Sequence, residues 1–156
     1  MARIEHYYDP DAPPANSIVV AVTAFVLNDA GELLMIQRSD NDLWAIPGGA
    51  QDIGESIAQT VVREVREETG ITVEVTGLVG VYSNPNHVIE YSDGEVRQQF
   101  SLCFRARPVG GELRTSSEST RVRWVPRDQL DALDIHPSMR LRIDHGYQHQ
   151  AEPYIG

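Results

Sequence analysis

Residues 47–71 read PGGAQDIGESIAQTVVREVREETGI, and this stretch gathers several acidic side chains on one short predicted helix. The glutamates are Glu55, Glu64, Glu67 and Glu68. Like charges three or four residues apart on a helix repel each other by roughly 0.2–0.5 kcal/mol per pair. The stretch therefore needs a partner that makes this crowding favourable.

The predicted helix has recognisable ends. Ser56 is a good N-cap, and Gln59 three residues later completes a capping-box pattern. Gly70 suits the left-handed position that follows the last residue of a helix. We therefore expect a helix over residues 56–69 that holds its acidic side chains at defined positions.

Helical spacing gives this helix two faces. The apolar stripe expected to pack on the core consists of Ala58, Val61, Val62 and Val65. Glu64, Glu67 and Glu68 fall within about a 100° arc on another side. Hard divalent cations such as Mg²⁺ or Mn²⁺ prefer clustered oxygen ligands, so this arc predicts a metal site. From spacing alone, the alternative is a solvated acidic helix face.

The whole stretch resembles the Nudix box, G-x5-E-x7-R-E-U-x-E-E-x-G-U, in which U is an aliphatic residue. The nine matching positions are Gly49, Glu55, Arg63, Glu64, Val65, Glu67, Glu68, Gly70 and Ile71. Every specified position of the pattern is filled, and the order of predicted strands around it is also similar to that of a Nudix domain.

This resemblance implies an enzyme that uses Mg²⁺ or Mn²⁺ to hydrolyse a phosphoanhydride bond in a nucleoside diphosphate linked to another moiety. The metal ligands it implies are the Gly49 carbonyl and the side chains of Glu55, Glu64, Glu67 and Glu68. Arg63 is expected to orient a box carboxylate by pairing with it. The general base is either a box glutamate or an acid from a later loop, where Glu118 is the best candidate. The predicted catalytic residues are therefore Arg63, Glu64, Glu67 and Glu118.

The rest of the chain reads mainly as short strands. Strands are expected over residues 17–28, 32–39, 43–49, 71–83, 87–91, 95–108 and 121–126, and helices over 127–133 and 137–150. The second of these strands is expected to return from the first as a hairpin. This order indicates an α/β (α+β) fold, which the resemblance specifies as a Nudix-type α/β/α sandwich around a mixed β-sheet. We expect one Nudix domain over residues 17–150, an N-terminal arm over 1–16 and a C-terminal tail over 151–156.

The balance of charge limits the partners. The chain has 13 basic and 23 acidic residues, a formal net charge of -10. This disfavours nonspecific binding to nucleic acid or to anionic membrane surfaces, and it repels a phosphate-bearing substrate unless cations intervene. No transmembrane or signal-peptide stretch is recognised, and the one cysteine excludes an intrachain disulfide. We expect a cytoplasmic protein that acts on a small-molecule nucleotide, binds no nucleic acid or membrane, and forms a homodimer.

The choice of substrate is less visible in the sequence. A nucleotide sugar such as ADP-ribose ranks first, because Pro85 lies near a position where relatives acting on ADP-ribose carry a proline. A nucleoside triphosphate, including an oxidised deoxynucleotide, ranks second. Two alternatives of other classes are a noncatalytic nucleotide-sensing Nudix-fold domain and a structural metal-binding domain. The candidate substrate contacts are Tyr82, His87, Tyr91, Arg97, Phe100, Arg105 and Arg107.

Overall fold

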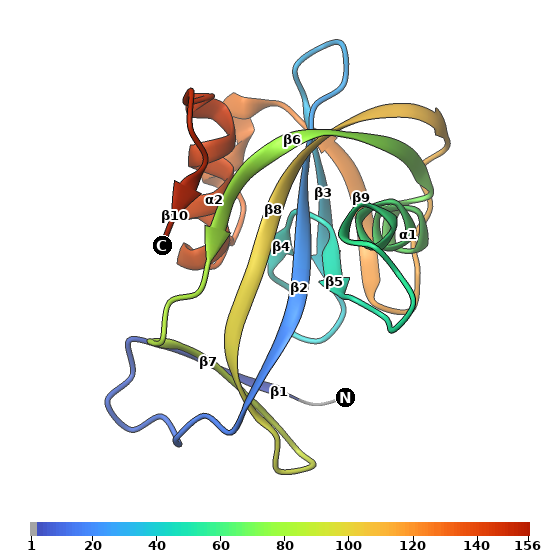
Figure 1. Cartoon of the computed structure of the whole chain (residues 1–156). Coiled ribbons are helices and arrows are strands. Elements are labelled where there is room, and N and C mark those ends of the chain that lie inside the picture. Colours follow the sequence, from blue (N-terminus) through green and yellow to red (C-terminus); the bar gives the residue numbers. More distant parts are fainter. Residues whose placement is uncertain (1–2) are drawn as a thin grey trace.

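The computed structural model describes residues 3–156, and a curved mixed β-sheet runs through its centre (Figure 1). The strands are β1 (Arg3–Tyr7), β2 (Ser17–Val26), β3 (Leu33–Arg38), β4 (Trp44–Ala45), β5 (Gly48–Ala50), β6 (Ile71–Tyr82), β7 (His87–Tyr91), β8 (Val96–Gly111), β9 (Ser119–Val125) and β10 (Tyr154–Ile155). The helices are α1 (Ile57–Thr69), the 3₁₀ helix η1 (Arg127–Ala132) and α2 (Pro137–Gln148).

Strand β8 is the axis of the larger sheet. Along one edge it pairs in parallel with β2, whose other edge pairs with β5. Along its other edge it pairs first with β7 and then with β6, both antiparallel. Strands β4, β3 and β9 form a second sheet of three strands. This arrangement of a mixed sheet with few helices confirms the predicted fold class.

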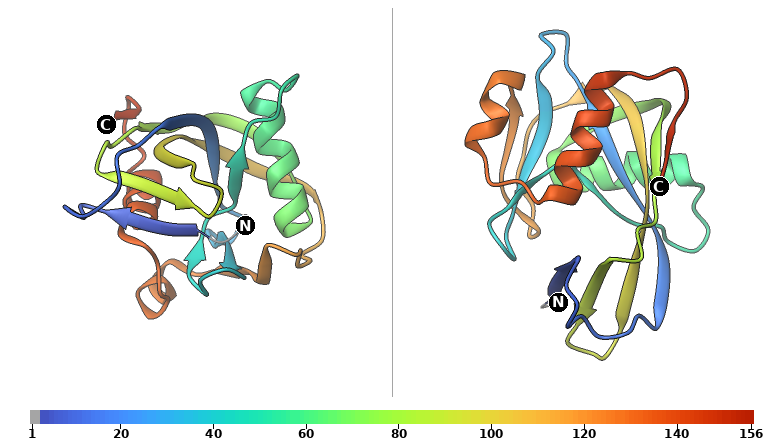
Figure 2. Two further views of the ribbon diagram at one scale, coloured as in Figure 1. Left: turned by 90° about the horizontal axis from the view of Figure 1, so that it is seen from below. Right: turned by 90° about the vertical axis from the view of Figure 1, so that its left-hand side faces the viewer.

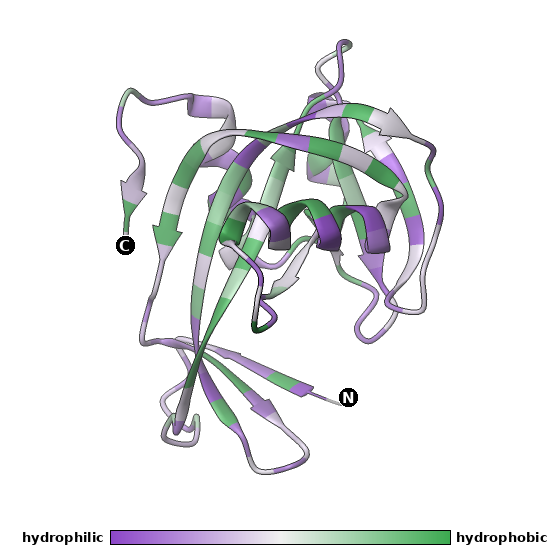
Figure 3. Cartoon of the chain, turned by 45° about the vertical axis from the view of Figure 1, so that its right-hand side comes forward, coloured by the Kyte–Doolittle hydropathy of each residue, from purple (hydrophilic) through white to green (hydrophobic). Residues whose placement is uncertain are grey.

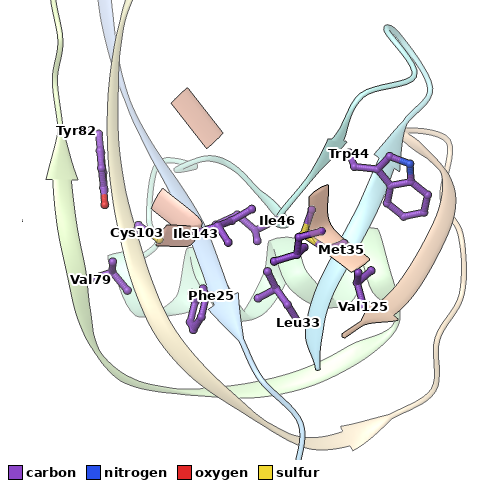
Figure 4. Close-up of a cluster of buried hydrophobic side chains, with 11 residues drawn as sticks. Phe25, Leu33, Met35, Trp44, Ile46, Val79, Tyr82, Cys103, Val125 and Ile143 are labelled. Carbon is purple, nitrogen blue, oxygen red and sulfur yellow. The ribbon is translucent and has the colours of Figure 1, made fainter. Parts of the chain in front are cut away.

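Each face of the central sheet has its own apolar cluster. One face packs on α1 through residues that include Val22, Val26 and Val65. The other face packs on α2 and the second sheet, with Phe25 and Ile143 among its buried side chains (Figure 4). The alternation along β2 is the two-residue period of a strand that is buried on both sides.

The ends of α1 follow the sequence prediction. The Ser56 hydroxyl accepts a hydrogen bond from the Gln59 backbone at 3.2 Å, and the Gln59 side chain accepts one from the Ser56 backbone at 2.8 Å. Gly70 adopts φ +81°, and a Cβ there would lie 2.1 Å from the Glu112 carbonyl oxygen. Both ends of the helix are therefore confirmed, and the positions of its acidic side chains follow from them.

The buried face of α1 differs from the predicted stripe. Val61 and Val65 are fully buried, but Ala58 is exposed, and Glu64 and Glu68 belong to the buried set. The predicted stripe is therefore confirmed for Val61 and Val65 and wrong for Ala58. The reason is that α1 lies across the sheet (Figure 3) and contacts β5 as well as β2 and β6, so Glu64 and Glu68 also face the protein.

The predicted hairpin over residues 17–28 and 32–39 is also wrong. Only Leu27 and Leu33 form a bridge, after which β3 leaves for the second sheet. The short helix expected over residues 127–133 is a 3₁₀ helix.

The two terminal segments contribute strands that the sequence did not suggest. Within residues 1–16, β1 pairs with β7 in a projecting part of the molecule (Figure 2), while residues 1–2 lie outside the described part. Within residues 151–156, β10 pairs in parallel with β6. In the described part of the chain, none of the helices has the length and apolar character needed to span a bilayer.

The capping box gives a test of how the helix is positioned. Ser56→Ala removes the side-chain acceptor, and we expect it to lower the free energy of unfolding by about 1 kcal/mol. Urea unfolding followed by circular dichroism measures this, with Ser92→Ala as a control at an exposed turn. Equal loss in both variants would contradict the assigned role of Ser56.

Candidate active site

Three carboxylates meet at the start of β9. One oxygen each from Glu64, Glu68 and Glu118 forms a group in which all three atoms lie within 4.8 Å of one another. Glu64 and Glu68 come from successive turns of α1, and Glu118 comes from the loop just before β9. The structure thus brings the expected outside acid beside two glutamates of the Nudix-like stretch.

Gly48 and Gly49 of β5 lie against the carboxylates of Glu68 and Glu64. The Gly48 backbone N–H donates to a Glu68 carboxylate oxygen at 3.0 Å. A Cβ at Gly49 would lie 2.4–2.6 Å from the carboxylate atoms of Glu64, closer than real contacts allow. A Cβ at Gly48 would lie 2.0 Å from the Val22 carbonyl oxygen. Glycine at position 48 is therefore required by the close approach of the β2 backbone, and glycine at position 49 leaves room for the Glu64 carboxylate.

Burial changes the acidity of the two helix carboxylates. It raises the pKa of Glu64 to about 7, against the opposing hydrogen bond from Arg63. It raises the pKa of Glu68 to about 8, against the Gly48 N–H, and the neighbouring Glu64 and Glu118 raise it further. Because burial makes these two carboxylates costly to ionise, a bound cation would stabilise their charged form. Clustered carboxylate oxygens are ligands that suit Mg²⁺ or Mn²⁺. The residues present therefore fit a divalent metal.

Arg63 forms ion pairs with Glu55 and Glu67, the other two glutamates of residues 47–71. Its guanidinium pairs with both oxygens of Glu55, one at 2.9 Å, and this hydrogen bonding lowers the pKa of Glu55 to about 2. The same side chain donates to Glu64 at 2.9 Å, to Glu67 at 3.2 Å and to the Ala50 carbonyl at 3.1 Å. Glu55 and Glu67 thus lie against Arg63, beside the cluster of Glu64, Glu68 and Glu118.

A cavity of about 560 Å³ opens next to the carboxylate cluster. Gly49, Glu68 and Glu118 line it together with residues of β1, β7, β8 and α2. Its arginines are Arg3, Arg38, Arg97 and Arg142. Four arginines and two carboxylates of the cluster, Glu68 and Glu118, therefore line the same cavity of a protein with a net negative charge.

Only some of the residues expected to contact the substrate line this cavity. His87, Tyr91 and Arg97 line it, whereas Phe100, Arg105 and Arg107 do not. Arg105 donates to the Gly146 carbonyl at 2.8 Å, and Arg107 is exposed and pairs with Glu74 at 3.0 Å. Tyr82 lies in the core cluster and lines only a smaller neighbouring pocket.

Sequence reasoning missed Arg3, Arg38 and Arg142 as cavity residues. They lie on β1, β3 and α2, which are far apart in the sequence. No local pattern connects them, because only the tertiary fold brings these elements to the same cavity.

Comparison with known proteins identifies the family. The model of the NUDIX domain family matches residues 18–145. The chain belongs to this family. The Nudix hydrolase predicted from the residues between Gly49 and Ile71 is thereby confirmed, and the carboxylate cluster lies within the matched range.

Named Nudix relatives cover most of the chain. A "MutT-like protein" of Streptomyces ambofaciens is 44% identical over 119 residues, which are 76% of this chain and 70% of that protein. An "ADP-ribose pyrophosphatase" of Methanocaldococcus jannaschii is 33% identical over 122 residues, 73% of this chain and 65% of that protein. A crystal structure of a NUDIX hydrolase from Nitrosomonas europaea has a TM-score of 0.72 at 20% identity, covering 90% of this chain and 80% of that one. The last similarity supports the fold.

The raised pKa of Glu68 gives a pH-dependent prediction for the metal-free protein. A carboxyl whose pKa is higher in the folded than in the unfolded state favours folding when protonated, so its contribution is lost as pH rises. For Glu68 this window runs from its ordinary value of 4.5 to about 8. The unfolding midpoint in chelator should therefore fall more steeply with rising pH in the wild type than in Glu68→Gln.

Differential scanning fluorimetry across this pH range measures the effect. Glu74→Gln, at an exposed glutamate on β6, is the matched control and should follow the wild type. Parallel pH curves for wild type and Glu68→Gln would show that the buried carboxyl does not titrate as described.

Proposed function

We propose that this Nudix domain hydrolyses a phosphoanhydride bond in a nucleoside diphosphate linked to another moiety, with a nucleotide sugar such as ADP-ribose as the substrate class. The observation that carries the proposal is the cluster of Glu64, Glu68 and Glu118 beside an arginine-lined cavity. The cavity has a volume within the usual range of about 300–1,000 Å³ for small-molecule sites. A relative named ADP-ribose pyrophosphatase supports the substrate class.

Mg²⁺ or Mn²⁺ would be held by the carboxylates of Glu64 and Glu68, with the carboxylate of Glu118 beside it. When bound, such a cation neutralises the carboxylates and stabilises the negative charge that develops on the phosphates during hydrolysis. Net charge supports this assignment, because an anionic substrate must approach a protein of charge -10.

The residues around the cluster have positioning roles in this proposal. The Gly48 N–H holds one oxygen of Glu68, and Arg63 holds Glu64 through a 2.9 Å hydrogen bond. Glu55 is bonded by Arg63, by the Asp52 N–H and by the Thr60 hydroxyl, so it fixes the guanidinium. Glu67 adds a further anionic contact to the same guanidinium.

Glu118 is the residue we assign as general base. It is the exposed member of the cluster and sits on a loop, whereas Glu64 and Glu68 are buried against β5. An exposed carboxylate beside the metal ligands can accept a proton from the attacking water and release it to solvent. Glu64 and Glu67 are the alternatives, and wild-type kcat in Glu118→Gln would favour them.

Single substitutions of glutamates in the cluster distinguish a role in metal binding from a role in proton transfer. Glu68→Gln should lower kcat at least about 100-fold and weaken Mn²⁺ binding, because it removes a ligand charge. Glu118→Gln should lower kcat by about 100-fold or more with a smaller change in Mn²⁺ affinity and in KM. Mn²⁺ titration and steady-state kinetics on each purified variant measure both effects. A Glu118→Gln enzyme with wild-type kcat would assign the base to another glutamate.

A substrate panel tests the proposed class. Release of nucleoside monophosphate should require Mg²⁺ and should be fastest with nucleoside diphosphate sugars. The panel includes nucleoside triphosphates, oxidised and unmodified, as the competing class. Fastest turnover of a triphosphate would move the assignment to that class, and metal binding without hydrolysis of any compound would favour a noncatalytic Nudix fold.

A further inference from the structure

Arg142 is a buried cation without a carboxylate partner. It lies on α2, lines the cavity and is 3% exposed. Its Nη1 donates to the Ser138 carbonyl at 2.6 Å, and its guanidinium lies 4.4 Å from the centroid of the Tyr82 ring. Its Nε has no hydrogen-bond partner, and no described carboxylate lies within the 4.0 Å of a salt bridge. Burying an uncompensated charge is costly, so a binding role is the natural explanation.

Glu5 also lines this cavity, but its carboxylate already contacts other side chains. Glu5 accepts a hydrogen bond from His87 Nε2 at 2.7 Å. The other Glu5 oxygen lies 3.9 Å from Arg3 and 3.9 Å from His136. Three cationic or imidazole groups thus surround this carboxylate before Arg142 is counted.

Three further residues of the same cavity, Arg3, Thr23 and Ser101, have buried polar atoms without hydrogen-bond partners. The Ser101 hydroxyl is on a residue only 1% exposed and has no hydrogen-bond partner in the described structure. Arg3 Nε is also without one, although Asp40 lies 3.4 Å away as an ion pair. Buried polar groups are normally hydrogen-bonded, so the convergence of Arg3, Ser101 and Arg142 on one cavity indicates a ligand rich in acceptor oxygens.

This set of residues lies apart from the carboxylate cluster. On the sheet, Ser101 of β8 is in register with Ala21 of β2, and Ala21 is in register with Ala50 of β5. Two strand spacings, about 10 Å in all, therefore separate Ser101 from Ala50, the residue next to the Gly49 that lies against Glu64. A group bound at Ser101 and Arg142 is accordingly a different part of the ligand from the phosphoanhydride bound at the cluster.

We infer that Arg142, Ser101 and Arg3 form an oxyanion subsite that selects substrates with a phosphate or carboxylate outside the diphosphate bridge. We call these three residues the Arg142 subsite. The inference rests on the proposed function for the rest of the substrate and makes its class narrower: an acid-bearing nucleotide sugar, such as a uronic acid or a phosphorylated sugar nucleotide. An oxyanion supplies the missing counter-charge of Arg142 and accepts hydrogen bonds from Arg3 and Ser101.

Two matched pairs of ligands test the subsite. UDP-glucose and UDP-glucuronic acid differ by one carboxylate, and ADP-ribose and its 2′-phosphate differ by one phosphate. Calorimetry in metal-free buffer gives the dissociation constants, and kinetics with Mg²⁺ give kcat/KM. In at least one pair, we expect the ligand with the extra acid group to bind about tenfold tighter or more than the partner that lacks it. The pair that shows this preference tells whether the subsite binds a carboxylate or a phosphate.

Variants assign the preference to the named residues. Arg142→Met and Ser101→Ala should each reduce the ratio between acid and neutral ligand, and Arg142→Lys should keep part of it because it retains the charge. Arg107→Met is the control, since Arg107 is exposed outside the cavity and should leave the ratio unchanged. Ser101→Ala removes an unpartnered hydroxyl at nearly constant volume, so it keeps the test valid where Arg142→Met fails to fold.

The outcomes separate this inference from the proposed function. A binding preference for the acid members that is lost in Ser101→Ala, without hydrolysis of any ligand, supports the subsite and overturns the proposed reaction. Hydrolysis without an acid preference in either pair overturns the subsite and leaves the reaction. An acid preference retained in Arg142→Met also overturns the subsite.

Discussion

The burial of two carboxylates against a glycine backbone is the constraint on which the site depends. Glu64 and Glu68 project from α1 onto β5, where Gly48 bonds one of them and Gly49 leaves room for the other. Their pKa values are raised by burial, so the folded protein holds them at a cost in the absence of a cation. The crowding of acids in the sequence is therefore an arrangement that a bound cation stabilises.

Arg63 offsets the repulsion between the other glutamates of the Nudix stretch. Its guanidinium bonds Glu55 and Glu67 outside the cluster, and it also bonds Glu64, which lies in the cluster with Glu68 and Glu118. The charges of the Nudix stretch thus separate into an internal ion-pair network and an acidic site. Across the same cavity, the Arg142 subsite supplies the opposite charge.

The acidic site could be predicted from the sequence because its determinants are local. Ser56 and Gly70 define the ends of α1, and helical spacing then places its glutamates. The exposed position of Ala58 and the burial of Glu64 could not be predicted, because they depend on how closely α1 approaches β5. Glu118 was reached through family resemblance, as its proximity to Glu68 comes from the position of a loop.

The cationic side of the cavity could not be predicted, because it is built from long-range contacts. Arg3 belongs to a segment expected to be an arm, yet that segment adds strand β1 to the sheet beside β7. Arg142 lies on a helix whose sequence shows no unusual pattern, and its lack of a counter-ion is visible only in three dimensions. The features that would select a substrate are therefore those with the least local signal.

The location of bound metal tests the central claim most directly. Crystals of the protein soaked in Mn²⁺ and measured at the manganese absorption edge should show an anomalous peak coordinated by carboxylate oxygens of Glu64 and Glu68, next to Glu118. A saturated crystal with no peak there, or with manganese only at Glu5, His87 and His136, which also form a possible ligand group, would contradict the account.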